Sequence, residues 1–247
     1  MKSMTFIIQS HLDWDRENRI LSPEWVKYRL DFYHKFTLPS LLNQSFADFR
    51  IFVYCGQRHR ALTESYPWHE CVEPCYNLGR SKLVAINTDY LSITRIDSDD
   101  LMHRDAMAEI RDSISLADGK DRECLIYEKN LKWSIVNRLI GHDYQKSSPY
   151  FTHVFPKRVY GNWPLYKSLH FLTHGRASPN ARVLSKHKVC TTRHWYNDSL
   201  IKQGLKRKLL TEKQRHELAA THPEVILDRD RIIKILKNFA VKKEDIK

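Results

Sequence analysis

Hydrophobic positions along this chain form short apolar runs that are separated by stretches with helical periodicity. Each run is followed by polar or turn residues, and this pattern predicts strands at 6–8, 50–55, 91–96 and 124–127. Apolar residues at helical spacing predict helices at 23–36, 38–44 and 104–116. Strands that alternate with helices indicate an α/β layer around a mainly parallel sheet.

The first predicted helix has a defined start and a defined end. Ser22 is a capping residue, Pro23 suits the first helical position, and an acidic residue follows. Pro39 then interrupts the pattern, so the second helix is predicted as a separate element. Residues 141–180 are rich in His, Pro, Gly, Tyr and Trp and have weak periodicity, which predicts long loops that shape a pocket.

The composition favours one large domain over two. The chain has 247 residues, of which 42% are hydrophobic, enough for one sizeable core. Apolar stretches stay well short of the ~18 residues of a membrane span, and the apolar run at 4–8 is too short for a signal peptide. We therefore expect a cytoplasmic protein, and its five scattered cysteines are expected to be reduced and mostly buried.

Positive charge is concentrated near the end of the chain. The formal net charge is +12, and residues 202–213 hold five Lys or Arg and one acid. Amphipathic helices are predicted at 205–218 and 231–239 in this basic region. A solvated basic face and a surface for peripheral contact with anionic lipid are both compatible with this pattern.

The run at 91–96 ends in a tight acidic turn that holds Asp97, Asp99 and Asp100. Like charges this close repel one another, so a divalent metal with bound phosphates is the expected compensation. The carboxyl end of a strand is also where open α/β sheets bind ligands. Taken alone, such acids also occur as helix caps or in solvated turns.

The segment 94–100 resembles the Asp-X-Asp segment of GT-A glycosyltransferases, and more narrowly that of a bacterial and viral rhamnosyltransferase family. A second match starts at Leu21-Ser22-Pro23-Glu24-Trp25, includes Arg29, and continues through the stretch 36–41 to Gln44 and Phe49. A third, looser match is Arg193-His194-Trp195-Tyr196-Asn197. The resemblance spans residues 5–200 and leaves the basic tail outside it.

This resemblance implies an α/β fold of the GT-A type, a Rossmann-like nucleotide-diphospho-sugar transferase with a mixed central sheet and a helical C-terminal extension. It divides the chain into a GT-A domain at 1–200 and a basic helical extension at 201–247. Within the domain, residues 1–105 form the nucleotide-sugar-binding half and residues 106–200 the acceptor half.

The resemblance also implies a reaction. A sugar, with rhamnose as the sugar of the family, moves with inversion from a UDP- or dTDP-linked donor to a glycan or lipid-linked acceptor, with Mn²⁺ or Mg²⁺ as cofactor. Asp97 then faces the ribose or reaches the metal through water, and Asp99 is the direct metal ligand. Asp100 supports the turn or faces the donor sugar. His194 is the expected late metal ligand, with His174 in reserve; either imidazole also fits an ordinary structural role.

The residues expected at the nucleotide sugar follow the first strand or flank the acidic turn; they are Gln9, His11, Arg16, Arg19, Arg80, Arg95, Asp97 and Ser98. Two roles are open for Arg95: it pairs with a carboxylate of the turn, or it contacts the diphosphate. Lys82 is a further candidate to reach the donor. Arg16 and Arg19 also fit a solvated loop.

An inverting transferase needs a carboxylate that takes the proton of the acceptor hydroxyl. The sequence does not single it out; Asp143 and then Glu128 are the candidates, and Trp163 is the candidate platform for an acceptor sugar. A basic nucleic-acid-binding protein or a metal-dependent nuclease is the alternative, argued from charge and aromatic content. Because the chain has neither finger spacing nor an aromatic, Gly-rich binding motif, no nucleic-acid partner is expected. The expected location is cytoplasmic, with peripheral contact at the inner face of a membrane.

Overall fold

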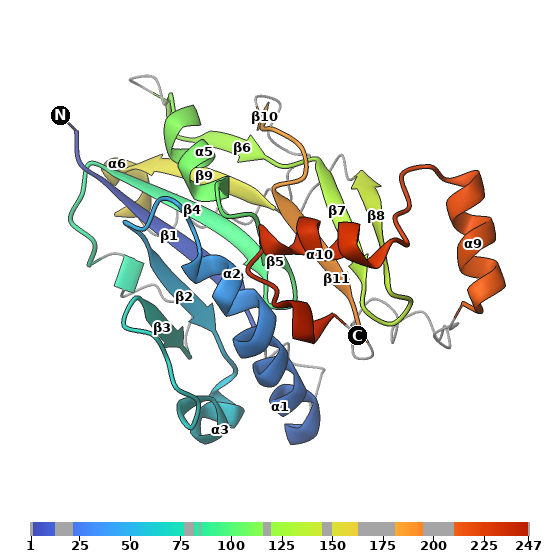
Figure 1. The fold of residues 1–247 in the computed structure, drawn as a ribbon. Coiled ribbons are helices and arrows are strands. Elements are labelled where there is room, and N and C mark those ends of the chain that lie inside the picture. Colours follow the sequence, from blue (N-terminus) through green and yellow to red (C-terminus); the bar gives the residue numbers. More distant parts are fainter. Residues whose placement is uncertain are drawn as a thin grey trace.

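The computed structural model contains two β-sheets, one of seven strands and one of four (Figure 1). It describes residues 2–12, 22–76, 82–83, 85–115, 120–144, 150–162, 181–194 and 210–246, with the side chains of 143 and 144 left out. The large sheet has the strand order β10-β6-β9-β4-β1-β2-β3. Its strands are β1 (Met4–His11), β2 (Arg50–Tyr54), β3 (Val72–Cys75), β4 (Tyr90–Asp97), β6 (Glu123–Ile126), β9 (Phe151–Pro156) and β10 (Arg182–Val183).

The large sheet is mixed. Strands β4, β1, β2 and β3 are parallel to one another, whereas β9 runs antiparallel to both β4 and β6. The chain adds β2 and β3 on one side of β1 and then returns to add β4 on the other side. The strand order therefore reverses between β1 and β4, which is a topological switch point. At this point His11 ends β1 and Asp97 ends β4, and the two residues are register partners.

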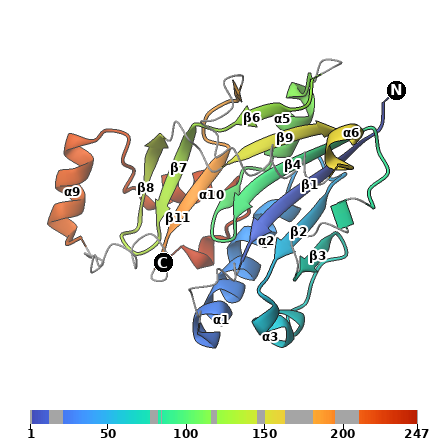
Figure 2. The same ribbon diagram turned by 180° about the vertical axis from the view of Figure 1, so that it is seen from behind.

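Helices α1 (Pro23–Phe32), α2 (Leu38–Leu42) and α5 (Ala106–Ser113) cover one face of this sheet (Figures 1 and 2). The predicted start of α1 is confirmed, because the Ser22 hydroxyl accepts a hydrogen bond from the Trp25 amide at 3.2 Å. The predicted interruption at Pro39 is wrong. A π-helical turn, Tyr33–Thr37, joins α1 to α2, and Pro39 lies in the first turn of α2, where its missing N–H costs little.

The prediction of long loops over 141–180 is wrong for its described part. Strand β8 (Leu139–Tyr144) extends into it, and β9 lies between β4 and β6 in the large sheet. Residues 151–155 are all buried, so β9 lacks the polar alternation that marks a half-exposed strand. A short helix, α6 (Lys157–Tyr160), follows it.

The small sheet has the order β5-β11-β7-β8, and its apolar side chains share one hydrophobic cluster with the C-terminal segment. Its other strands are β5 (Leu101–Met102), β11 (Val189–Arg193) and β7 (Lys129–Ser134). Of the two predicted C-terminal helices, α9 is observed at Glu212–Thr221 and α10 at Arg229–Lys237. Leu236 of α10 and Trp133 of β7 belong to one hydrophobic cluster, so α10 is part of the core. The division of the chain at residue 200 stays a prediction.

The remaining described elements are short: η2 (Gln57–His59), α3 (Arg60–Glu64) and η4 (Lys243–Asp245). Four of the five cysteines are buried and Cys71 is half-buried, as predicted. Among the helices that the structure describes, none combines the length and the apolar character that crossing a bilayer requires.

Candidate functional site

Polar side chains gather at the carboxyl ends of β1 and β4, on the face of the sheet that points away from α1. Gln9 is the register partner of Arg95, and His11 is the partner of Asp97. Partners in register project to the same face, and residues two apart on a strand do as well. The opposite face, which carries Ile8 and Ile96, packs in the core cluster that contains α1. The structure thus brings together four of the residues predicted to bind the nucleotide sugar.

Contacts between these residues hold the cluster in place. The Gln9 amide Nε2 donates to the Tyr54 hydroxyl at 2.9 Å, and the His11 ring stacks on Tyr54 with centroids 4.9 Å apart. Arg95 Nη2 donates to Asp97 Oδ1 at 2.9 Å, so of the two roles left open for Arg95 the structure shows the pairing with a carboxylate of the turn. The Asp97 side chain remains 36% exposed, so its carboxylate is accessible to a ligand.

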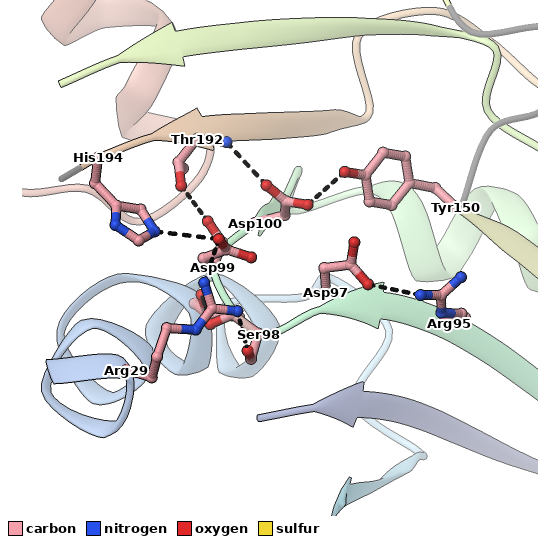
Figure 3. A network of polar contacts seen from close by, with 10 residues as sticks. Arg29, Arg95, Asp97, Ser98, Asp99, Asp100, Tyr150, Thr192 and His194 are labelled. Carbon is pink, nitrogen blue, oxygen red and sulfur yellow. Dashed lines mark hydrogen bonds and ion pairs between the residues drawn. The ribbon is translucent and has the colours of Figure 1, made fainter. Parts of the chain in front are cut away.

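Asp99 points the other way, toward α1 and the end of β11 (Figure 3). Its Oδ2 accepts a hydrogen bond from Arg29 Nη1 and lies 3.1 Å from His194 Nε2. Arg29 Nη2 also donates to the Ser98 hydroxyl at 2.6 Å. The side chains of Arg29 and Asp99 are 7% and 11% exposed, so this ion pair is buried.

Sequence reasoning missed the role of Arg29, although a signal for it exists. Val26, Arg29, Leu30 and Tyr33 are buried at helical spacing, so Arg29 is a lone charge on an apolar stripe. A buried charge is stable only with a partner of opposite sign. An arginine at such a position therefore predicts a carboxylate on the element against which the helix packs.

The environment of Asp99 favours its ionised form. Burial alone raises the pKa of this carboxyl, but the Arg29 guanidinium and hydrogen bonds from His194 and Arg29 outweigh burial and hold the pKa well below its ordinary value. Asp99 is therefore an anion at neutral pH, and its charge is balanced by Arg29.

This depressed pKa predicts how stability depends on pH. Below the ordinary pKa of 3.8 the unfolded chain takes up a proton at this position before the folded protein does. The stability that Asp99 contributes is therefore complete above that pH and is lost as the pH falls further. We expect Asp99→Asn to be less stable than the wild type at about pH 7 and 5, with a gap that shrinks by about pH 3. Urea unfolding of both proteins measures the gap; a gap that is unchanged at the lowest pH contradicts the prediction.

Asp100 is held by Thr192 of β11 and by Tyr150, which directly precedes β9. Its Oδ1 accepts from the Thr192 amide at 2.8 Å, and its Oδ2 accepts from the Tyr150 hydroxyl. Burial and the negative charges of Asp99 and Asp97 raise the pKa of Asp100 well above its ordinary value. The Thr192 hydroxyl also donates to the Asp99 carbonyl, so the acidic turn is tied to β11 at two points.

Asp99 and His194 are a carboxylate and an imidazole that could hold a hard divalent cation. In this structure their 3.1 Å contact is a hydrogen bond and Asp99 Oδ2 is also paired with Arg29, so a cation would replace the hydrogen bond between the two side chains. Within the described ranges, no three His, Cys, Asp or Glu side chains are grouped so that they could hold a metal. The structure thus brings Asp99 and His194 together but leaves Asp97 beside Arg95. A cation here would take its other ligands from phosphate and water, as Mg²⁺ usually does.

The other predicted residues have varied placements. Ser98 is fully buried, and its hydroxyl contacts Arg29. Lys82 forms an ion pair with Glu73 of β3. Glu128 lies half-buried in the turn between β6 and β7, and its role as a base stays a prediction. The predicted positions outside the described part of the chain are Arg16, Arg19, Arg80, Trp163, His174 and the side chain of Asp143.

Comparisons with known proteins give distant likenesses only. No protein-family model matches the chain, and no curated protein matches it. The structure of S. aureus TarS is 14% identical, with 97% of this chain and 43% of that chain covered and a TM-score of 0.38. Rv0371c from Mycobacterium tuberculosis H37Rv is 15% identical, with 78% and 91% covered and a TM-score of 0.36.

A third solved structure, CMP:2-keto-3-deoxy-manno-octonic acid synthetase complexed with CTP, is 13% identical, with 82% of this chain and 99% of that chain covered and a TM-score of 0.31. This chain thus spans less than half of TarS. Likenesses of this size assign neither a family nor an activity to the chain.

Proposed function

We propose that this protein is a metal-dependent glycosyltransferase that uses a nucleotide-diphosphate sugar as donor. One observation carries the proposal: Gln9, His11, Arg95 and Asp97 share one face at the carboxyl ends of β1 and β4, where the strand order reverses. Open α/β sheets bind their ligands in the crevice at this position. An acidic turn with an accessible carboxylate follows directly, as a donor with a metal-bound diphosphate requires.

The residues have distinct roles in this proposal. Asp99 and His194 hold the Mn²⁺ or Mg²⁺ ion, and Asp97 faces the ribose or reaches the metal through water. When bound, the ion neutralises charge that develops on the diphosphate leaving group. His11 and Tyr54 offer stacked rings beside Asp97 for the nucleobase. Arg29, Tyr150 and Thr192 keep the acidic turn in position for all of these contacts.

The chemical step is an inverting transfer to an acceptor hydroxyl. A carboxylate, Asp143 or else Glu128, takes the hydroxyl proton while the acceptor oxygen bonds to the anomeric carbon and the bond to the diphosphate oxygen breaks. Rhamnose is the first sugar to test, because the motifs at 21–49 and 94–100 resemble those of a rhamnosyltransferase family, although no family model matches the chain. The acceptor is a glycan or a lipid-linked chain, and the basic tail at 201–247 makes peripheral contact with an anionic membrane surface.

Ligand-dependent thermal stability separates this proposal from nucleic-acid binding. We expect Mn²⁺ with UDP or dTDP to stabilise the protein, by about 2.7 kcal/mol when the nucleotide is at 100 times its Kd. The control mixtures are Mn²⁺ alone, UDP with EDTA, and Mn²⁺ with single-stranded DNA or RNA. Stabilisation by nucleic acid and not by either nucleotide diphosphate would overturn the proposal in favour of the nucleic-acid-binding alternative.

A further inference from the structure

A cavity of about 700 Å³ lies on the α1 side of the acidic turn. Its walls come from four parts of the chain: α1 with the π-helical turn, β7 with the turn after it, His194 at the end of β11, and the C-terminal segment. Large apolar side chains form much of the lining, among them Phe32, Trp133 and Ile232. The volume is in the range of small-molecule binding sites.

The charged groups that line this cavity are mostly basic. They are Lys35, Arg138, Arg215 and Arg229, against the single acid Asp245. Asp245 is paired with Lys35 at 2.8 Å. Each of two arginines donates to a main-chain carbonyl, Arg215 to Asn137 at 3.5 Å and Arg229 to Ile246 at 3.1 Å.

The three arginines of the cavity lack carboxylate partners among the residues that the structure describes. Arg215 Nε is buried and has no hydrogen-bond partner there. Arg138 is exposed in the turn after β7, with a backbone φ of 53°. Guanidinium groups without a carboxylate are suited to bind phosphate, whose oxygens match their paired N–H donors.

We propose that this cavity binds the acceptor substrate, and that the acceptor is an amphiphile with a phosphate head, an apolar body and the hydroxyl that receives the sugar. The arginines hold the phosphate, and the aromatic and aliphatic walls hold the apolar body. The inference rests on the proposed glycosyltransferase function and specifies the class of its acceptor.

The position of the cavity fits an acceptor rather than the donor. Gln9 and Asp97 project from the face of the large sheet opposite to α1, whereas Phe32 of α1 lines the cavity. His194 connects the two sides, because it lines the cavity and its Nε2 lies 3.1 Å from Asp99 Oδ2. A ligand in the cavity therefore meets the proposed metal site at His194 while the opposite face stays open for the nucleotide.

Calorimetric titration of the protein with decyl phosphate tests this inference. The buffer contains EDTA and no nucleotide, and the decyl phosphate concentration stays below the point at which micelles form. Decanol and inorganic phosphate are the matched probes, each with half of the chemistry. We expect decyl phosphate to bind at least about tenfold more tightly than either, because decanol lacks the charged hydrogen-bond acceptor and inorganic phosphate lacks the apolar chain that the cavity walls would bury. Equal binding of decanol or of inorganic phosphate overturns the inference.

Variants then locate the binding. Arg215→Ala and Arg138→Gly are each expected to weaken decyl phosphate binding about tenfold or more. Glycine suits the positive φ at position 138, so Arg138→Gly is expected to keep the turn intact. This variant still tests the inference if Arg215→Ala does not fold. The matched control is Lys213→Ala, since Lys213 lies in the same helix as Arg215, is 86% exposed and does not line the cavity. The affinity of this control variant for decyl phosphate should change less than about twofold.

Each remaining outcome is informative. Absence of decyl phosphate binding, or binding that both arginine variants leave unchanged, overturns the acceptor inference. If UDP with Mn²⁺ still stabilises the protein in that case, the proposed function survives. If the two variants weaken UDP binding and leave decyl phosphate unaffected, the cavity belongs to the donor and the inference is wrong.

Discussion

Replacing Arg29 by alanine is expected to lower the free energy of unfolding by about 3–5 kcal/mol, because it leaves the Asp99 carboxylate buried without its cation. The Ser98 hydroxyl loses a hydrogen bond at the same time. Urea denaturation near neutral pH measures the loss. The matched control on the same helix is Lys27→Ala, because the ion pair of Lys27 with Asp31 is exposed. This substitution should lower the free energy of unfolding by no more than about 0.5 kcal/mol.

A second substitution identifies the cause of this loss. If the unpaired charge of Asp99 is responsible, then Asp99→Asn in the Arg29→Ala background should recover a large part of the stability, and a double-mutant cycle should show strong coupling. A loss below about 1 kcal/mol for Arg29→Ala, or additive effects of the two substitutions, contradicts a buried ion pair.

Replacing Asp97 by asparagine is expected to reduce metal-dependent turnover of the nucleotide sugar about 10–100-fold, the usual effect of losing a group that acts on a metal from its outer shell. The same substitution should change the stability by less than about 1 kcal/mol, because the pair of Arg95 and Asp97 is partly exposed. Turnover at fixed Mn²⁺ concentration and urea unfolding together measure the two effects.

The control for this variant is Asp112→Asn on α5. Asp112 is 65% exposed and forms an ion pair with Arg111 at 2.7 Å, so the variant loses a comparable surface contact outside the acidic turn. It should keep the wild-type turnover. If Asp97→Asn also keeps the wild-type turnover, Asp97 has no role at the donor and the assignment of the nucleotide face is wrong.

Each of the four apolar runs that were predicted as strands, at 6–8, 50–55, 91–96 and 124–127, lies in or overlaps an observed strand. Strands β2, β4 and β6 were predicted to within one residue at both ends, whereas the run predicted at 6–8 stops three residues before the end of β1, which carries Gln9 and His11. Strand β9 was not predicted, because it is buried on both faces and contains His153, so neither alternation nor a purely apolar run marks it. Its antiparallel pairing with β4 and β6 makes the sheet mixed, as the resemblance implied, while the other four strand pairings of the sheet are parallel.

The acidic turn was located from sequence, but its partners were not. Arg29, Tyr150 and Thr192 lie 70, 50 and 92 residues from the carboxylates they contact, and no local pattern encodes such pairings. From the sequence, a divalent metal was the expected compensation for the acidic turn, and Arg95 was the protein cation considered beside it. The structure pairs Arg95 with Asp97 and adds Arg29 as the cation for Asp99.

The register between β1 and β4 could not be predicted from the sequence either. Gln9, His11, Arg95 and Asp97 were each expected near the nucleotide, yet only the pairing of the two strands places them on one face. Register depends on how both strands pack against distant helices, and a shift by one residue would send these side chains into the core.

The central claim is that this face and the acidic turn bind a nucleotide-diphosphate sugar with a divalent metal. The most direct test incubates the purified full chain with Mn²⁺ and a panel of UDP- and dTDP-linked sugars, dTDP-rhamnose included, and measures release of the nucleoside diphosphate. We expect that at least one donor is consumed and that EDTA stops the release. Absence of release from every donor, together with absence of binding of UDP and dTDP in the presence of Mn²⁺, would contradict it.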